Sequence, residues 1–165
     1  MKKQFVKKQP RLNSEVCTPE KARAYAFLLL KYRLRSENEL KTRLKQKGFS
    51  LALAESTVSF LKEREFIDDQ VFARGWVSSR LKRPLGKRKI KLELMQKGVA
   101  AEIIQEALAW ANQDYSESQT VTQLAKQRFS KIQGIDPLKA KMRVYGYLMR
   151  RGFSPDLVQE AIRQL

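Results

Sequence analysis

The chain has 165 residues, of which 42% are hydrophobic, and its 34 Lys and Arg outnumber 17 Asp and Glu to give a net charge of +17. That apolar content suffices for an ordinary globular core, and the charge favours an anionic partner. With no His and a single Cys, Cys17, the sequence excludes an internal disulfide, a structural zinc site and a Cys-His nucleophile. We expect no enzymatic activity, no metal and no cofactor.

Residues 1–17 lack helical periodicity and carry five basic side chains: Lys2, Lys3, Lys7, Lys8 and Arg11. They are typical of a basic arm rather than a secretory signal. No stretch of the sequence is long and apolar enough to span a bilayer.

The first fifty residues after this arm predict three helices. Thr18 followed by Pro19 is a helix N-cap with proline at the first helical position. Ser36 and Glu39 have the spacing of a capping box that begins a second helix, which stops at Gly48. The residues after Gly48 regain amphipathic spacing, so residues 18–66 form a predicted three-helix repeat.

The same pattern recurs twice. Gly98 and Gly152 follow Gly48 at intervals of 50 and 54 residues, and each ends a basic helix before an apolar residue. Apolar residues also recur eight and four positions before the glycine and five and ten after it: Leu40, Ile90, Val144; Leu44, Leu94, Leu148; Leu53, Ile103, Leu157; and Val58, Leu108, Ile162. Each glycine is interpreted as a helix cap, since glycine accepts a positive φ.

Further caps place the other helix starts. Asp68 precedes the first helix of the second repeat, residues 67–112, while Ser116 and Asp136 precede helices of the third, residues 113–165. No stretch alternates in the manner of a strand. The predicted fold is therefore all-α, with three tandem three-helix repeats forming an elongated, curved stack.

Positive charge follows the second helix of each repeat. Residues 37–47, 87–97 and 137–151 carry four basic against two acidic residues, five against one, and five against none. Cations between Lys82 and Lys91 straddle a helix start, where the helix dipole disfavours them, which indicates an external anionic partner. The predicted partner and DNA contacts are Lys41, Arg74, Arg80, Lys82, Arg83, Lys87, Arg88 and Lys91.

Two other readings of the residues are less favoured. The third helices are neutral or acidic, so they are poor candidates for reading base edges as a helix-turn-helix protein does. The adjacent acids Asp68 and Asp69 are better explained by capping than by catalysis. For base stacking we favour Tyr145 over Trp76, whose spacing predicts a core position.

The middle repeat resembles the signature of the RecX regulatory proteins. The resemblance rests on residues 66–77 together with Arg80, Gly86, Ile90, Glu93, Leu94, Lys97, Gly98 and Val99, and residues 34–49 are similar to the first repeat of that family. It implies a bacterial cytoplasmic protein that binds the RecA recombinase filament, and we expect the chain to be a monomer. It also implies inhibition of ATP turnover, strand exchange and stimulated repressor cleavage, the reactions of homologous recombination and the SOS response.

Two functional hypotheses follow. The first is a clamp on the RecA filament that also touches single- or double-stranded DNA, independently of sequence, through its basic side chains. The alternative is a general nucleic-acid-binding repeat protein with no preference for the recombinase. The two differ in whether inhibition requires saturation of the DNA.

Overall fold

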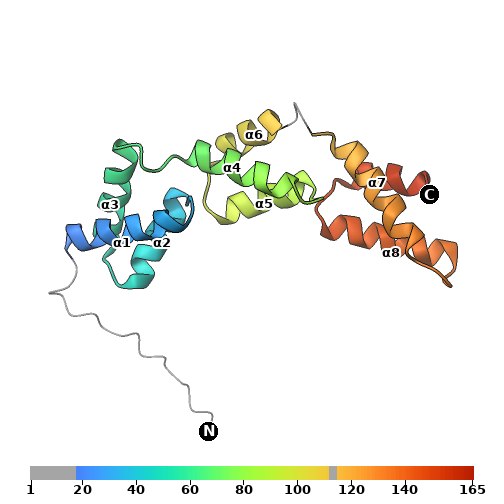
Figure 1. The fold of residues 1–165 in the computed structure, drawn as a ribbon, viewed down its shortest axis with the longest axis horizontal. Helices are drawn as coiled ribbons and strands as arrows, with labels where there is room; N and C mark the ends of the chain where they lie inside the picture. Colours follow the sequence, from blue (N-terminus) through green and yellow to red (C-terminus); the bar gives the residue numbers. More distant parts are fainter. Residues whose placement is uncertain (1–17, 112–114) are drawn as a thin grey trace, which may run out of the picture. The chain divides into compact units, whose positions relative to one another are not determined.

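The computed structural model describes residues 18–111 and 115–165, and every regular element in these ranges is an α-helix (Figure 1). The predicted basic arm, with Cys17, and residues 112–114 at the predicted boundary of the third repeat lie outside the described residues. The helices are α1 (Pro19–Tyr32), α2 (Glu37–Lys47), α3 (Leu51–Glu63), α4 (Asp69–Leu81), α5 (Lys87–Gln96), α6 (Ala101–Trp110), α7 (Glu117–Ser130), α8 (Pro137–Arg150) and α9 (Pro155–Arg163).

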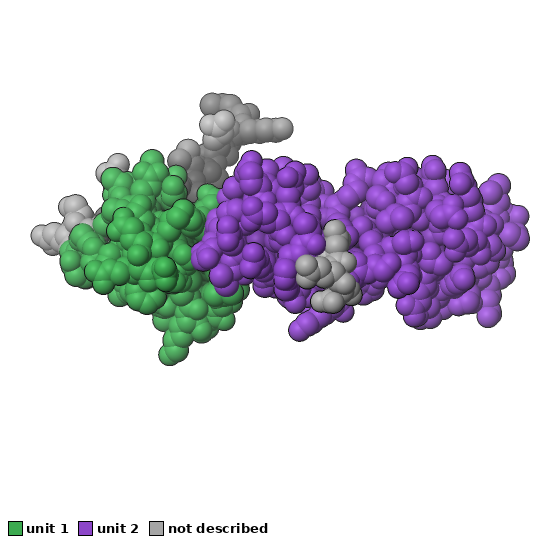
Figure 2. All heavy atoms as spheres, turned by 90° about the horizontal axis from the view of Figure 1, so that it is seen from above, with its two compact units in different colours: residues 1–67 green, residues 68–165 purple. Residues whose placement is uncertain are grey.

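The chain divides into two compact units, residues 1–67 and residues 68–165, which Figure 2 colours separately. The first unit contains α1 to α3 and the second contains α4 to α9. The main helix–helix contacts all join helices of one repeat, such as α4 with α6 and α7 with α9. Each repeat is thus a three-helix bundle in its own right, as the sequence predicts. None of the described helices has the length and apolar content needed to cross a membrane.

The predicted caps form where the sequence places them. The side chain of Thr18 accepts the Lys21 N–H at 3.4 Å, and that of Ser36 accepts the Glu39 N–H at 3.1 Å. Asp68 accepts two N–H groups, from Gln70 and Val71. At the starts of α7 and α8, the Ser116 side chain accepts the Gln119 N–H and the Asp136 side chain accepts the Lys139 N–H. These bonds satisfy amide groups that a helix start leaves free.

The three repeated glycines end their helices in one way. Gly48, Gly98 and Gly152 have φ of 106°, 73° and 82°, in the left-handed region. The following apolar residue donates its N–H to the carbonyl five residues earlier in each case: Phe49 to Leu44, Val99 to Leu94 and Phe153 to Leu148. This is the Schellman closure that the Gly-apolar pattern predicts.

Each repeat has its own apolar core. The side chains eight and four residues before the glycine are fully buried in all three copies: Leu40, Leu44, Ile90, Leu94, Val144 and Leu148. The third helices differ from prediction by one residue, because Ala54, Ile104 and Val158, six residues after the glycine, are fully buried. The predicted positions Leu53, Ile103 and Leu157 are only half-buried at the edge of each core.

The connector after α3 is a tight turn. Glu65 adopts a φ of 56°, and the next residue, Phe66, donates its N–H to the Leu61 carbonyl at 2.9 Å. The closure is thus the same as at the three glycines, with a side chain at the left-handed position. Ile67 then joins the core of the first repeat.

Candidate functional site

The second and third repeats meet at the loop between α4 and α5, whose backbone groups form hydrogen bonds with residues of the third repeat. This loop makes two hydrogen bonds with one residue of the third repeat, donating one and accepting the other. The Gly86 N–H donates to the Arg151 carbonyl at 2.9 Å, and the Arg151 guanidinium donates to the Pro84 carbonyl at 3.2 Å. The Tyr115 hydroxyl donates to the Leu85 carbonyl at 3.3 Å. These hydrogen bonds join the second repeat to the third.

Two glycines permit this close approach. A Cβ on Gly86 would overlap the carbonyl of Gly152, and a Cβ on Gly152 would overlap Lys89. Gly86 has a φ of −76°, which any residue can adopt. Glycine is required at this position because the neighbouring backbone leaves no room for a Cβ. Gly152 therefore serves both as a helix cap and as a contact surface between repeats, whereas its sequence pattern predicts the cap alone.

The start of α5 is capped from the next repeat. Gly86 stands at the N-cap and has no side chain to accept a hydrogen bond, and the Lys87 N–H instead donates to the Glu117 carboxylate at 3.0 Å. An anionic oxygen at a helix start offsets the dipole there. Part of the cationic crowding at this helix start is therefore balanced within the chain, which weakens the sequence argument for an external partner at Lys87.

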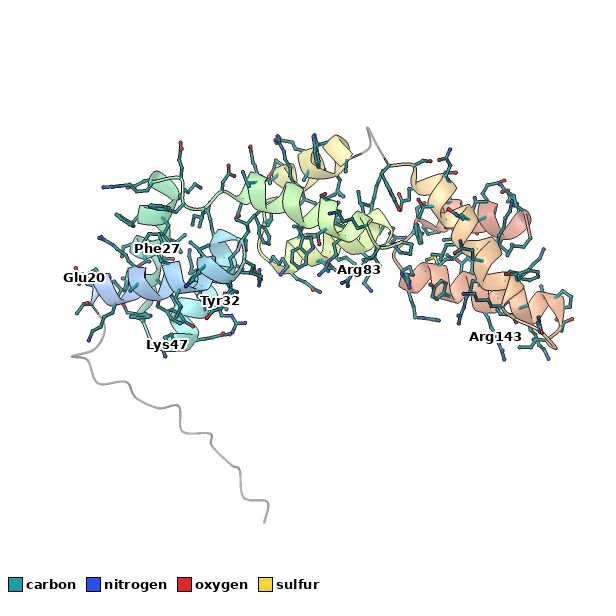
Figure 3. All side chains as sticks on the ribbon, in the orientation of Figure 1. Glu20, Phe27, Tyr32, Lys47, Arg83 and Arg143 are labelled. Carbon is teal, nitrogen blue, oxygen red and sulfur yellow. The ribbon has the colours of Figure 1, made fainter. Side chains whose placement is uncertain are left out.

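We call the contact of Pro84, Leu85 and Gly86 with Tyr115, Arg151 and Gly152 the junction. A cationic cleft of about 580 Å³ lies beside this junction. Its lining brings together side chains from α4, α5 and α8 and from the loops that follow α4 and α8: Arg80, Arg83, Leu85, Lys89, Glu93, Tyr147, Arg150 and Arg151. Five of these residues are cationic and one is acidic. Figure 3 labels Arg83, just beyond the end of α4.

Glu93, the one carboxylate among the described residues that line the cleft, is already engaged. Glu93 accepts hydrogen bonds from the Trp76 indole N–H at 2.9 Å and from Arg80 Nε at 2.6 Å. The Arg80 guanidinium also lies 4.1 Å from the centre of the Trp76 ring. The charge of Arg80 is thus neutralised by Glu93. The positive potential of the cleft comes from the other four cations: Arg83, Lys89, Arg150 and Arg151.

Tyr147 and Arg150 extend the cationic surface along the third repeat. Both residues also line a neighbouring hollow, whose other lining residues include Arg128 and Arg143, the latter labelled on α8 in Figure 3. The guanidinium carbons of Arg128 and Arg151 lie 5.0 and 5.1 Å from the centre of the Tyr147 ring. Such cation–π contacts hold long arginine side chains in place beside the cleft.

The structure places the predicted contact residues in several different environments. Arg80 and Arg83 line the cleft, and Arg88 lines a separate hollow on α5. Lys41 belongs to the first unit, where its ammonium group pairs with Glu55 at 3.3 Å. The remaining predicted residues lie outside the cleft lining: Arg74, Lys82 and Lys91, which are exposed, and Lys87, which is half-buried with its ammonium group 5.8 Å from the Tyr115 ring.

Sequence reasoning missed the contribution of the third repeat to this cleft. Arg151 stands in the last turn before a cap, where the helix dipole alone explains a cation. Tyr145, the aromatic residue favoured for stacking, packs partly buried against the core of the third repeat, and Tyr147 lines the cleft instead. The available signal was the charge of residues 137–151, which hold five basic residues and no acidic one.

The cleft is suited to binding anions. Guanidinium and ammonium groups that converge on one hollow bind phosphate or carboxylate oxygens through charge-assisted hydrogen bonds. Burial of Tyr115, near the junction, raises the pKa of its phenol. That group already donates to a backbone carbonyl.

Three family models match consecutive parts of the chain. They are described as the first, second and third three-helix domains of RecX, and they match residues 22–61, 68–108 and 116–162. Each match falls within one of the three bundles, so the repeats seen in the structure correspond one by one to the domains of that family.

Whole-chain comparisons agree. Over 147 residues the chain is 36% identical to "Regulatory protein RecX" of Chlorobium phaeobacteroides (strain BS1), covering 88% of this chain and 94% of that protein. It is 35% identical over 158 residues to the protein of the same name from Mycobacterium sp. (strain JLS), covering 93% and 86%. The crystal structure of RecX from Lactobacillus salivarius superposes with a TM-score of 0.75 at 22% identity, covering 89% of this chain and 96% of that one. A second solved structure, a regulatory protein RecX, gives a TM-score of 0.78 at 23% identity, covering 89% and 73%. The chain belongs to the RecX family of regulatory proteins.

Proposed function

We propose that this chain binds the RecA filament assembled on DNA and lowers its recombinase, ATPase and coprotease activities. It acts as a monomer in the bacterial cytoplasm and has no catalytic centre of its own. Family membership supports the regulatory role. The single observation that supports binding to an anionic polymer is the cleft beside the junction, where four cations without a carboxylate partner in residues 18–111 and 115–165 face one hollow.

The cleft does not favour sequence-specific recognition. Arg83, Lys89 and Arg150 are exposed side chains on a helix or loop, and none lies on the third helix of a bundle. Cations arranged in this way neutralise phosphates of any sequence. Contact with the DNA strand therefore adds affinity for the filament, while the choice of the recombinase depends on protein contacts elsewhere.

One titration tests the proposal against general nucleic-acid binding. The protein is added to RecA on single-stranded DNA, and the rate of ATP hydrolysis is followed. Inhibition below one regulator per recombinase subunit supports binding to the filament. Inhibition only at amounts that saturate the DNA identifies competition for the strand, and no inhibition at all contradicts the proposal.

A double variant tests the cleft itself. Arg83→Ala with Arg150→Ala removes two of its four unneutralised cations, while Lys126→Ala with Lys139→Ala removes the same charge from exposed positions outside the lining. For duplex DNA, four phosphate contacts give a slope of log affinity against log salt of about −4, and the cleft variant reduces it to about −2. The control variant should retain the original slope. Equal loss in both variants would show that overall charge, rather than the cleft, drives binding.

A further inference from the structure

A second hollow lies between the second and third repeats and differs in chemistry from the cationic cleft. It has a volume of about 340 Å³ and lining residues from α5, α8 and the cap that follows α8: Arg88, Lys89, Leu92, Met149, Arg150, Gly152 and Phe153. Lys89 and Arg150 line both hollows. The floor of this second hollow is apolar.

The apolar floor includes Leu92, which belongs to none of the three apolar cores in the described residues. Leu92 is 57% exposed, and Met95, three residues along the same face of α5, is 54% exposed. The buried face of α5 is formed instead by Ile90 and Leu94. Large aliphatic side chains left in water on adjacent turns lose hydrophobic stabilisation, and such a patch is typical of a binding surface. Gly152 contributes to the hollow by adding no side chain to its lining.

The rim is cationic. Arg88, Lys89 and Arg150 surround the floor, and the lining residues in the described part of the chain include no carboxylate. The complementary ligand therefore carries negative groups on both sides of an apolar group. A nucleic-acid strand supplies phosphates but no aliphatic side chain for the floor. Phe153, the only ring among the described lining residues, is fully buried and offers no face for stacking.

We propose that this hollow binds an acidic segment of a partner protein, with one Leu- or Phe-sized side chain against Leu92 and Met149. Asp or Glu residues flanking that side chain pair with Arg88, Lys89 and Arg150. An anchor side chain in a pocket surrounded by charged contacts is a common design of protein–protein recognition. The site is independent of the function proposed above, because it requires neither DNA nor inhibition of the recombinase.

The test uses the full chain and two fluorescein-labelled peptides. One is a twelve-residue peptide of alternating Asp and Gly with a central Phe, and the other has Ser in place of the Phe. Fluorescence anisotropy at low salt should show about tenfold tighter binding of the Phe peptide, because only its side chain gains from burial. Equal affinities would mean that charge alone attracts the peptide, and no binding of the Phe peptide would equally overturn the proposal.

Matched variants locate the site. Leu92→Ser removes the apolar floor at an exposed position, and Leu138→Ser changes a 70% exposed leucine on α8 that does not line the hollow. Leu92→Ser should lower affinity for the Phe peptide about fivefold to tenfold. Leu138→Ser should leave that affinity unchanged, with the helix content of both variants checked by circular dichroism. An unchanged affinity in Leu92→Ser, or equal losses in both variants, would overturn the assignment.

A third variant separates this site from the cationic cleft. Arg83 lines the cleft and not the apolar hollow, so Arg83→Ala should weaken binding of an oligothymidylate while leaving the Phe peptide unaffected. Leu92→Ser should show the reverse pattern. If Leu92→Ser instead weakens the oligothymidylate and not the peptide, the hollow binds nucleic acid and the proposal is wrong.

Discussion

Two glycines of the third repeat both have φ in the left-handed region but lie in very different surroundings. Gly134, in the loop before α8, has a φ of 68°, and a Cβ added there would meet nothing within 4 Å. Gly152, after α8, has a φ of 82°, and a Cβ there would overlap Lys89 of the second repeat. One position therefore requires glycine for its backbone alone, and the other for its backbone and for the contact between repeats.

Gly152→Ala should be the most damaging of the substitutions considered. The left-handed backbone costs a side chain about 1 to 2 kcal/mol, and the forced separation from Lys89 adds about 1 to 3 kcal/mol. Urea unfolding followed by circular dichroism should show a loss of about 2 to 5 kcal/mol. Gly134→Ala is the matched control and should lose only the backbone part.

Equal losses at the two positions would contradict the contact. Tryptophan fluorescence gives a second reading, because both Trp residues, Trp76 and Trp110, lie in the second repeat. Gly152→Ala should shift the unfolding seen by these probes, although residue 152 is in the third repeat. Gly134→Ala, which meets no neighbouring atoms, should shift them less.

Gly86→Ala isolates the steric part of the same contact. With φ of −76° and ψ of 151°, Gly86 has a conformation that alanine adopts without strain. In an uncrowded site such a change stabilises a protein by about 0.4 to 1 kcal/mol through the unfolded chain. Overlap with the Gly152 carbonyl should instead give a loss of about 1 to 3 kcal/mol in urea unfolding. A gain in stability would show that the two loops separate readily.

The features predicted from sequence are those fixed by neighbours in the chain. The caps at Thr18, Ser36 and Asp68 and the Schellman closures depend on residues within six positions of one another. The buried positions before each glycine follow from helical periodicity. Interactions between neighbouring residues were therefore enough to predict the nine described helices and their division into three small bundles.

The junction and its cleft depend on contacts that no local pattern contains. Gly86 and Arg151 are 65 residues apart, and the hydrogen bond between them decides which cations converge. Counting charge by helix identified the basic second helices but not which of their side chains face one hollow. The sequence predicts Arg83 as a contact residue only as one of several neighbouring cations. Lys89, Tyr147 and Arg150 line the cleft only because the second and third repeats pack against each other.

Tyr115→Phe tests the polar part of the junction and should have a smaller effect. Loss of the hydrogen bond to the Leu85 carbonyl should cost about 0.5 to 1.5 kcal/mol at neutral pH. Burial raises the pKa of Tyr115 above that of a free tyrosine, about 10. The contribution of the neutral Tyr115 side chain to the free energy of unfolding is therefore complete below a pH of about 10. It is lost as the pH rises through the raised pKa of this group.

The pH dependence gives this prediction its check. Urea unfolding of the natural chain and of Tyr115→Phe should differ most near neutral pH. The difference should shrink when the measurement is repeated above a pH of about 10. A constant difference across this range would mean that the ring contributes only packing.

The smallest effect should be a gain, at the left-handed position of the first unit. Glu65 is the only residue other than glycine with a positive φ in residues 18–111 and 115–165. Glu65→Gly removes a backbone cost of about 1 to 2 kcal/mol, and the greater freedom of glycine in the unfolded chain offsets about 0.5 to 1 kcal/mol of it. A net stabilisation of about 0.5 kcal/mol should appear as slower hydrogen exchange of the Phe66 amide, which closes the turn on Leu61. Glu65→Ala is the control, since it removes the carboxylate but keeps the Cβ. If Glu65→Ala protects the Phe66 amide as well as Glu65→Gly does, the loss of the carboxylate accounts for the gain. The left-handed backbone at residue 65 would then carry no cost of the kind that Gly134→Ala should show at an uncrowded left-handed position.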